Sequence, residues 1–146
     1  MPDSRAVPQQ WRYTTTQPDS GWTRPDYDDA AWRTGPGGFG TDSTPGAVVR
    51  TAWNTPDLWI RRTFILPAAP LVRPHLRIHH DEDAEVYVNG RRIASLAGYT
   101  TGYMIVPLDA DAAAALKPGA NTLAIHVRQT TGGQYIDVGL IEVLNP

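Results

Sequence analysis

Residues 81–92 read DEDAEVYVNGRR, and this stretch carries the strongest fold signal in the chain. Apolar and polar side chains alternate over residues 84–88, which is the pattern of a strand with one buried face. Asn89-Gly90 follows, and a second run extends over residues 93–96. Asn-Gly between two such runs predicts a two-residue hairpin turn, because both turn residues must adopt positive φ. We therefore expect an antiparallel hairpin with residues 89–90 at its tip.

Outside this hairpin the chain also favours short strands. Thirteen glycines and 13 prolines interrupt it every few residues, and helical periodicity is nearly absent. About eight short strands separated by turn residues predict an all-β fold, an antiparallel β-sandwich. After Gly139 the apolar alternation changes phase, which predicts a β-bulge there. The strand candidates besides the hairpin are residues 11–16, 58–66, 76–80, 103–108, 123–128 and 136–140.

One short connector helix is expected at residues 109–117. This stretch is rich in alanine, Asp109 or Asp111 can cap its N-terminus, and Pro118-Gly119 ends it. At 146 residues the chain has the size of one domain. We expect residues 1–10, which are polar and contain proline, to be a loosely held leader, and residues 11–146 to form a single sandwich domain.

Composition excludes several functional classes. The chain has no cysteine, so it offers no thiol nucleophile, disulfide or cysteine-ligated zinc site. A net charge of −2 lacks the basic excess that a nucleic-acid or anionic-membrane surface needs. No apolar run approaches the roughly 20 residues of a membrane span, and the N-terminus has no apolar signal segment. We expect neither nucleic acid nor membrane as a partner.

Five segments carry a family resemblance. They are Trp22 with residues 25–32 (PDYDDAAW), then 35–40 (GPGGFG), 58–64 (LWIRRTF), 84–90 (AEVYVNG) and 118–124 (PGANTLA). Their order and spacing, across roughly residues 9–143, resemble the jelly-roll, galactose-binding-like domain of glycoside hydrolase family 2 and related carbohydrate-binding modules.

The resemblance implies a jelly-roll sandwich that accompanies a catalytic barrel in a larger enzyme. In that family the domain carries few or none of the catalytic residues, and a 146-residue chain has no room for a barrel of ~250 residues. We therefore expect no catalytic residue in this chain. We also expect a catalytic glycoside hydrolase domain as partner in the parent chain. The sequence leaves a cytoplasmic location open, and we expect an extracellular, secreted one as part of a larger bacterial protein. Sugar binding follows by analogy, since a fold does not fix a function.

Topology suggests where a sugar would bind. If strand direction alternates from residue 58 onward, four polar segments that include aromatic residues meet at one end of the sandwich, and the hairpin tip lies at the other. These segments are residues 53–57, 80–83, 99–100 and 129–135. Aromatic rings can cover the apolar face of a sugar, while carboxylates and amides bond to its hydroxyls. The predicted carbohydrate-binding residues are Trp53, Asn54, Asp81, Glu82, Asp83, Tyr99, Gln129, Gln134 and Tyr135.

The acidic and aromatic candidates also have structural interpretations. Residues 81–83 fit a sugar-binding edge, a calcium site or a solvated turn. Trp53 fits either a core position or an exposed binding position. The remaining tryptophans are expected to serve packing; they are Trp11, Trp22, Trp32 and Trp59.

The basic residues favour structural roles. His79 and His80 are adjacent in a strand and point to opposite faces, which argues against zinc, so calcium is the one cofactor considered. His126 fits a surface or interface position. Either Arg61 or Arg62 is expected to form a structural bridge with a buried carboxylate, with Asp137 and Glu85 as candidates.

The leading hypothesis is a non-catalytic module that binds poly- or oligosaccharide weakly, with Trp53, Tyr99 or Tyr135 stacking on the sugar. The rival is a structural domain that packs on a catalytic neighbour and binds no free sugar. A stand-alone glycoside hydrolase is a lesser alternative. Asp81 and Asp83 would lie about 7 Å apart along one strand, but no cleft between paired carboxylates is identifiable in the sequence.

Overall fold

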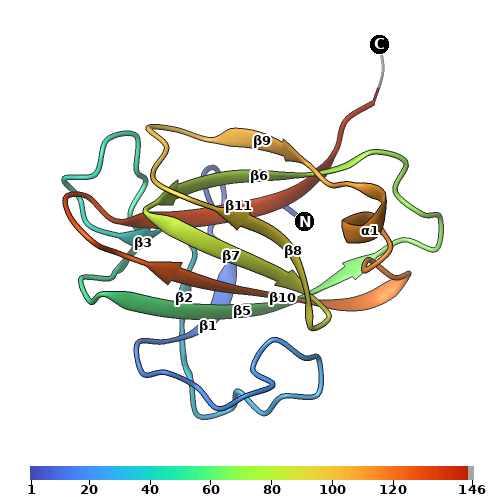
Figure 1. Ribbon diagram of the computed structural model, residues 1–146, viewed down its shortest axis with the longest axis horizontal. Helices are drawn as coiled ribbons and strands as arrows, with labels where there is room; N and C mark the ends of the chain where they lie inside the picture. The colour runs from blue at the N-terminus through green and yellow to red at the C-terminus, as the bar shows by residue number, and fades with distance from the viewer. Residues whose placement is uncertain (145–146) are drawn as a thin grey trace.

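The computed structural model describes residues 1–144, which fold into two β-sheets packed face to face (Figure 1). The six-stranded sheet has the order β2 (Arg33–Pro36), β1 (Gln10–Thr14), β5 (Asp57–Leu66), β10 (Gly119–Arg128), β7 (Asp83–Val88) and β8 (Arg91–Leu96). The five-stranded sheet has the order β4 (Thr51–Ala52), β3 (Phe39–Gly40), β11 (Tyr135–Glu142), β6 (Pro74–Asp81) and β9 (Met104–Pro107). The all-β sandwich predicted from the sequence is confirmed.

Strand pairing is antiparallel in both sheets except between β3 and β4. Every predicted strand is present, with boundaries that differ by a few residues. The sequence missed β2, β3 and β4, because these strands are two to four residues long and show no alternation of apolar and polar side chains.

The hydrophobic core lies between the sheets, since alternate residues of each strand point inward. From β10, Leu123, Ile125 and Val127 contribute to it, and from β6, Leu76 and Ile78; none of them is more than 1% exposed. Burying each such side chain contributes roughly 1.5–3 kcal/mol. The long central strands β5, β6, β10 and β11 therefore form a rigid frame that carries the loops at either end.

The predicted hairpin is present, with Asn89 at φ 51° and Gly90 at φ 86° between β7 and β8. The Asn89 side chain also ties the tip to its surroundings. Its Nδ2 donates to the Ala115 carbonyl and to Asn121 Oδ1, both at 2.9 Å, and its Oδ1 accepts from the Thr122 amide at 2.9 Å. The turn is thus fixed by both backbone conformation and side-chain bonds.

The connector helix is shorter than predicted. Helix α1 spans Ala110–Ala113, and Asp109 is its N-cap, accepting from the Ala112 amide at 2.7 Å. After Ala113 the chain continues in tighter turns, with the Ala115 amide donating to the Ala112 carbonyl, and the Lys117 amide then donates to Asn121 Oδ1 at 2.9 Å. None of the helical structure in residues 1–144 has the length and hydropathy of a membrane-spanning helix.

The bulge expected near Gly139 is absent, and β11 pairs with β6 in unbroken register from Tyr135 to Glu142. The change of phase in the sequence has another cause, which is that β11 is buried on both faces as far as Leu140. The outer face of Gly139 is covered by residues 1–3, so closely that a Cβ there would lie 2.8 Å from the Asp3 amide nitrogen.

The N-terminal segment is therefore not the loose leader predicted from its composition. Met1 and Leu140 exchange backbone hydrogen bonds of 3.0 and 2.9 Å. The Ser4 amide donates to Asp137 Oδ2 at 2.8 Å, and Asp3 pairs with Arg77 at 2.6 Å. Both Asp3 and Ser4 are buried. Polar residues dock here because the outer face of the sheet itself offers a charged and hydrogen-bonding surface.

A long loop, residues 15–32, covers part of the outer face of the six-stranded sheet (Figure 1). Arg61 anchors it, pairing with Asp29 at 2.7 Å and donating to the carbonyls of Trp22 and Arg24. The predicted structural bridge thus involves Arg61, but its partner is Asp29 rather than Asp137 or Glu85. The loop brings Asp29 back across the sheet, and no local sequence pattern predicts this contact.

Candidate functional site

The four segments predicted to converge do meet at one end of the sandwich, where β6, β10 end and β5, β7, β11 begin. The Thr100 amide donates to the His80 carbonyl at 2.8 Å, and the Thr130 amide donates to Glu82 Oε2 at 3.2 Å. Gln134 Nε2 donates to the Thr55 carbonyl at 3.0 Å. The hairpin tip lies at the opposite end, beside α1 (Figure 1).

A cavity of about 260 Å³ opens among these loops. We call it the loop-end cavity; its lining residues are Pro45, Asp81, Glu82, Tyr99, Thr100, Thr101, Thr131, Gly132 and Gly133. Its volume lies just under the roughly 300–1,000 Å³ typical of pockets for drug-sized ligands. It therefore suits a small polar ligand or a single unit of a longer chain.

Asp81 is the unusual group in this cavity. Asp81 is only 7% exposed, and no group in residues 1–144 donates a hydrogen bond to its carboxylate. Burial, and next the charge of Glu82, raise the pKa of Asp81. The carboxylate oxygens of Asp81 are not fully enclosed and reach solvent in the cavity. A carboxylate that lines a cavity in this state can accept hydrogen bonds from a ligand's hydroxyl or amide groups.

Gly133 and Tyr99 complete the surroundings of Asp81. A Cβ at Gly133 would lie 2.9 Å from Asp81 Oδ2, so only glycine leaves this oxygen its space. Tyr99 forms an isolated antiparallel bridge with Asp81 and is 66% exposed. An exposed aromatic ring beside an unpaired carboxylate offers an apolar face and a hydrogen-bond acceptor at the same place.

The three neighbouring carboxylates do not gather around one point. Glu82 accepts from the Thr130 amide, and Asp83 Oδ1 accepts from the Gly98 amide at 2.7 Å, while Asp81 lines the cavity. Among residues 1–144, no three His, Asp or Glu side chains come together as a metal site would require. Calcium at residues 81–83 remains a prediction from the sequence.

Two predicted stacking residues are in the interior. Trp53 is 3% exposed and belongs to the core, with its Nε1 donating to Thr55 Oγ1 at 3.0 Å. Tyr135 is 0% exposed, and its hydroxyl donates to the Val48 carbonyl at 3.2 Å. Tyr135 is fully enclosed, and Trp53 borders the groove that Asn54 lines with only 3% of its surface exposed. Both sit in short loop or strand-end positions that the sequence could not distinguish from exposed ones.

The predicted amides have supporting roles. Gln134 is buried and holds the Thr55 loop, and Gln129 Nε2 donates to the Gly132 carbonyl at 3.2 Å, which closes the turn beside the cavity. Asn54 is exposed but lines a separate groove with Asp42. Of the predicted residues, only Asp81, Glu82 and Tyr99 line the loop-end cavity.

The two adjacent histidines support the cavity wall from behind. His79 Nε2 donates to the Thr100 carbonyl at 3.0 Å, and its ring packs against Tyr103 and Tyr135. Burial lowers the pKa of His79, which favours the neutral ring. His80 Nδ1 lies 2.7 Å from the Glu82 carbonyl oxygen. The two histidines therefore have separate hydrogen-bond partners.

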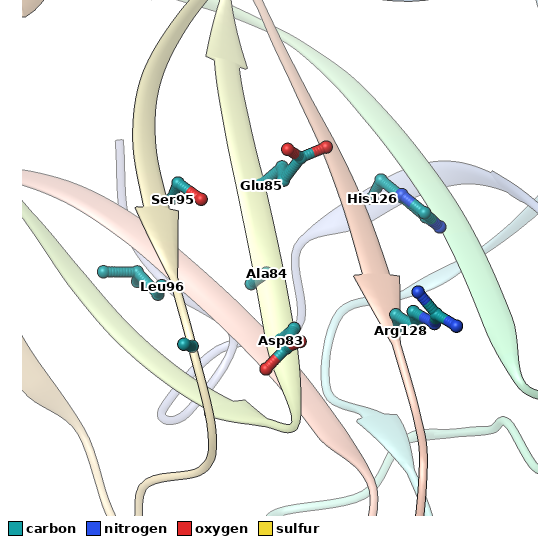
Figure 2. A pocket seen from close by; sticks show the side chains of 8 residues that line it. Asp83, Ala84, Glu85, Ser95, Leu96, His126 and Arg128 are labelled. Carbon is teal, nitrogen blue, oxygen red and sulfur yellow. The ribbon is translucent and has the colours of Figure 1, made fainter.

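A second cavity, which was not predicted from the sequence, lies on the outer face of the six-stranded sheet (Figure 2). Its polar lining comes from β7, β8 and β10, which are distant in sequence and become neighbours through strand register. Alternation of polar residues on these strands was visible in the sequence, but their pairing was not.

Comparison with known proteins gives relatives that are much longer than this chain. No protein-family model matches it. An α-L-rhamnosidase of Streptomyces avermitilis is 29% identical over 133 residues, which cover 80% of this chain and 12% of the enzyme. The chain thus spans about an eighth of this curated relative.

Solved structures share the fold. A glycoside hydrolase family 2 member from Bacteroides cellulosilyticus superposes with a TM-score of 0.64 at 16% identity, over 92% of this chain and 20% of that one. A calcium-binding mutant of β-glucuronidase 2 from Bacteroides uniformis gives 0.65 at 15% identity, over 93% and 18%. A β-glycosidase from Bacteroides vulgatus gives 0.60 at 17%, over 91% and 19%. The resemblance stated from the sequence is confirmed for the fold, and the chain corresponds to about a fifth of each enzyme.

Proposed function

We propose that this chain is a non-catalytic carbohydrate-binding module that takes a sugar in the loop-end cavity. The observation that carries the proposal is Asp81, a largely buried residue whose carboxylate has no hydrogen-bond partner in residues 1–144 and reaches solvent in a cavity next to the exposed residue Tyr99. Sugar hydroxyls are the complementary donors, and the C–H face of a sugar ring is the complementary surface for Tyr99.

The rest of the lining fits the same ligand. Threonine hydroxyls from positions 100, 101 and 131 can each donate and accept, as the hydroxyls of a sugar also do. Gly132 and Gly133 leave the approach to Asp81 open. Such a shallow site, with one free carboxylate and one aromatic ring, supports weak and selective binding rather than tight enclosure.

The parent protein is proposed to be a larger, secreted glycan-degrading enzyme. The support is that similar proteins are a rhamnosidase and several glycosidases, and that this chain corresponds to a small part of each. A chain of 146 residues has no room for a catalytic barrel of ~250 residues, which supports a non-catalytic role.

The alternative is a structural domain that packs on a catalytic neighbour. One observation favours it: the edge strand β9 presents Ile105, which is 54% exposed, next to the partly exposed Met104. An apolar edge of this kind can be covered by another domain. This surface lies on a different strand from the loop-end cavity, so the two roles are compatible in one chain.

The test is isothermal titration of the chain with a glycan panel that includes L-rhamnose, glucuronic acid and galactose, with and without calcium. We expect saturable binding by the wild type and a loss of about tenfold or more in D81N, because hydrogen bonds to a charged group contribute ~1.5–3 kcal/mol. Asp111→Asn, an exposed acid on α1 at the far end, is the matched control and should bind like the wild type. If the folded wild type binds no glycan, the proposal is wrong.

The pH dependence of binding provides a second check. The acceptor role requires the ionised carboxylate, and the pKa of Asp81 is raised above 3.8 by burial and by Glu82. Affinity should therefore increase as the pH rises through this raised pKa and should be lost as the pH falls below it. D81N should show no such dependence; a wild-type affinity that is constant across this range would contradict the assigned role.

A further inference from the structure

The second cavity, which we call the outer-face cavity, has a volume of about 280 Å³ and opens on the outer face of the six-stranded sheet (Figure 2). Its lining residues are Asp83, Ala84, Glu85, Ser95, Leu96, Ala97, His126 and Arg128. They come from the start of β7, the end of β8 and the end of β10. The cavity thus lies at the same end of the sandwich as the loop-end cavity.

Strand register arranges its polar groups in rows. Ser95, Glu85 and His126 are direct cross-strand partners on β8, β7 and β10. In the next row, Asp83 of β7 is opposite Arg128 of β10. The middle strand therefore supplies acceptors and the strand beside it supplies a guanidinium and an imidazole (Figure 2). Neighbouring hydroxyls of a polyol can donate to one row and accept from the other.

Two charged side chains of this cavity, Glu85 and Arg128, differ in whether they have partners within the protein. Glu85 Oε1 accepts from Arg92 at 3.0 Å and Oε2 from the Tyr87 hydroxyl at 3.1 Å. The side chain of Arg128 makes no hydrogen bond or ion pair with any residue that the structure describes, and the residue is exposed. A guanidinium in this state has its donors available to a ligand. Because carboxylates on β7 stand beside a guanidinium on β10, a neutral polyhydroxylated ligand fits better than a strongly charged one.

His126 is fixed in place at the side of the cavity. Its ring stacks on Trp59, with centroids 4.7 Å apart and an angle of 2° between the planes, and its Nε2 is 2.8 Å from Asp57 Oδ1. Trp59 is buried, so the imidazole is the outer ring of this stack. A flat ring held rigidly beside hydrogen-bonding groups can pack against a sugar ring at little cost in side-chain entropy.

The two cavities share a wall. Asp81 and Glu82 line the loop-end cavity, while Asp83 lines the outer-face cavity. On the facing turn, Tyr99 lines the first cavity and Ala97 the second. The bond of 2.7 Å from the Gly98 amide to Asp83 Oδ1 joins these two turns into a rim. A ligand longer than one cavity needs only to cross this rim to reach the other.

We propose that the outer-face cavity is a second subsite for the same ligand, so that a neutral oligosaccharide seated in the loop-end cavity continues over the rim onto β7, β8 and β10. This inference rests on the proposed function and specifies its ligand as an internal or terminal stretch of a glycan chain rather than a free monosaccharide. Glu85 and Arg128 bond to the hydroxyls of the second unit, and His126 packs against its ring.

The test compares affinity along length series, from monosaccharide to hexasaccharide, of neutral gluco-, manno-, xylo- and rhamno-oligosaccharides. The wild type should bind chains of two or more units about tenfold more tightly than the monosaccharide, an increment of ~1.4 kcal/mol. In E85Q and R128A this increment should disappear while monosaccharide affinity is unchanged. D81N should weaken binding at every length. Arg91→Ala, an exposed arginine at the hairpin end of the sheet, is the matched control and should keep the increment.

The results separate the two proposals. Monosaccharide binding without an increment in the wild type, or an increment that survives in E85Q and R128A, overturns the second subsite and leaves the binding function intact. No binding at any length overturns both. As an independent readout, the ring resonances of His126 should shift with a bound oligosaccharide but not with the monosaccharide. Circular dichroism of each variant checks that it is folded.

Discussion

At the residue scale, burial rather than residue type distinguishes a candidate ligand contact from a core residue. Trp53 and Tyr99 are both aromatic residues at the loop end of the sandwich. Trp53 is 3% exposed and packs in the core, whereas Tyr99 is 66% exposed and lines the loop-end cavity. A loss of binding after removal of Trp53 would therefore report on stability as much as on a ligand contact.

Truncation of Trp53 should lower stability, whereas truncation of Tyr99 should lower glycan affinity. Trp53→Ala removes a buried ring and should lower the free energy of unfolding by about 3–5 kcal/mol. Tyr99→Ala changes an exposed side chain, so its effect on stability should stay within about 0.5 kcal/mol, while glycan affinity falls. Urea denaturation and titration calorimetry of both variants measure this. Equal losses of stability would contradict the assignment of Trp53 to the core.

At the element scale, the β7–β8 hairpin is stabilised by two separate properties of Asn89. Its backbone adopts φ 51°, which few residues other than glycine and asparagine accept without strain. Its amide group bonds to Ala115, Asn121 and Thr122, which links the hairpin tip to α1 and β10. The tip is therefore both a local turn and a tertiary contact.

Two substitutions separate these contributions. Asn89→Gly keeps the backbone conformation and loses the side-chain bonds, so it should cost about 2–3 kcal/mol at roughly 1 kcal/mol for each bond. Asn89→Ala loses the same bonds and adds left-handed backbone strain of about 1–2 kcal/mol. Chemical denaturation of both variants gives the difference. If alanine and glycine destabilise equally, the strain at φ 51° is not significant.

At the scale of the whole molecule, the outer face of the five-stranded sheet carries a buried polar network. His79 of β6 and Asp137 of β11 are cross-strand partners, and they contact Thr100, Tyr103 and Ser4 from three other parts of the chain. Burial lowers the pKa of His79 and raises that of Asp137, since it disfavours the charged form of each. Stability should therefore depend on pH through both groups, with opposite signs.

The His79 contribution is expected in mildly acidic solution. Its folded-state pKa lies below 6.5, so the unfolded state binds the proton first as the pH falls, and stability is lost from about pH 6.5 down to the folded-state pKa. His79→Gln can keep the bond to the Thr100 carbonyl and should show a flatter profile. Urea denaturation from pH 8 to pH 5 measures this, with His75→Gln on the same strand as control. A profile for His79→Gln as steep as the wild type would assign the pH dependence to other groups.

Asp137 should act in the reverse direction. Because its folded-state pKa is raised above 3.8, the folded state holds this proton more strongly, and stability declines as the pH rises from 3.8 through the raised value. The side chain keeps hydrogen bonds from Tyr103 at 2.6 Å and from Ser4, which limit this loss. The two contributions therefore oppose each other: stability rises with pH through the titration range of His79 and falls with pH through that of Asp137.

Local patterns in the sequence determined the strands, the hairpin turn, the Asp109 cap and the end of the sandwich where Asp81 and Tyr99 meet. Alternation with a period of two, turn chemistry and strand direction are properties of short segments, and they can be read without knowledge of the fold. The fold class, and the end of the sandwich at which the site lies, follow from these local patterns.

Only the tertiary structure decided which candidates face a ligand. It buried Trp53 and Tyr135, gave Arg61 the partner Asp29, docked residues 1–4 on β11, and paired Glu85 with His126 beside Arg128. Each of these outcomes depends on contacts between segments far apart in the chain. Burial and strand register are set by the packing of two sheets and their loops, and no short stretch of sequence carries that information.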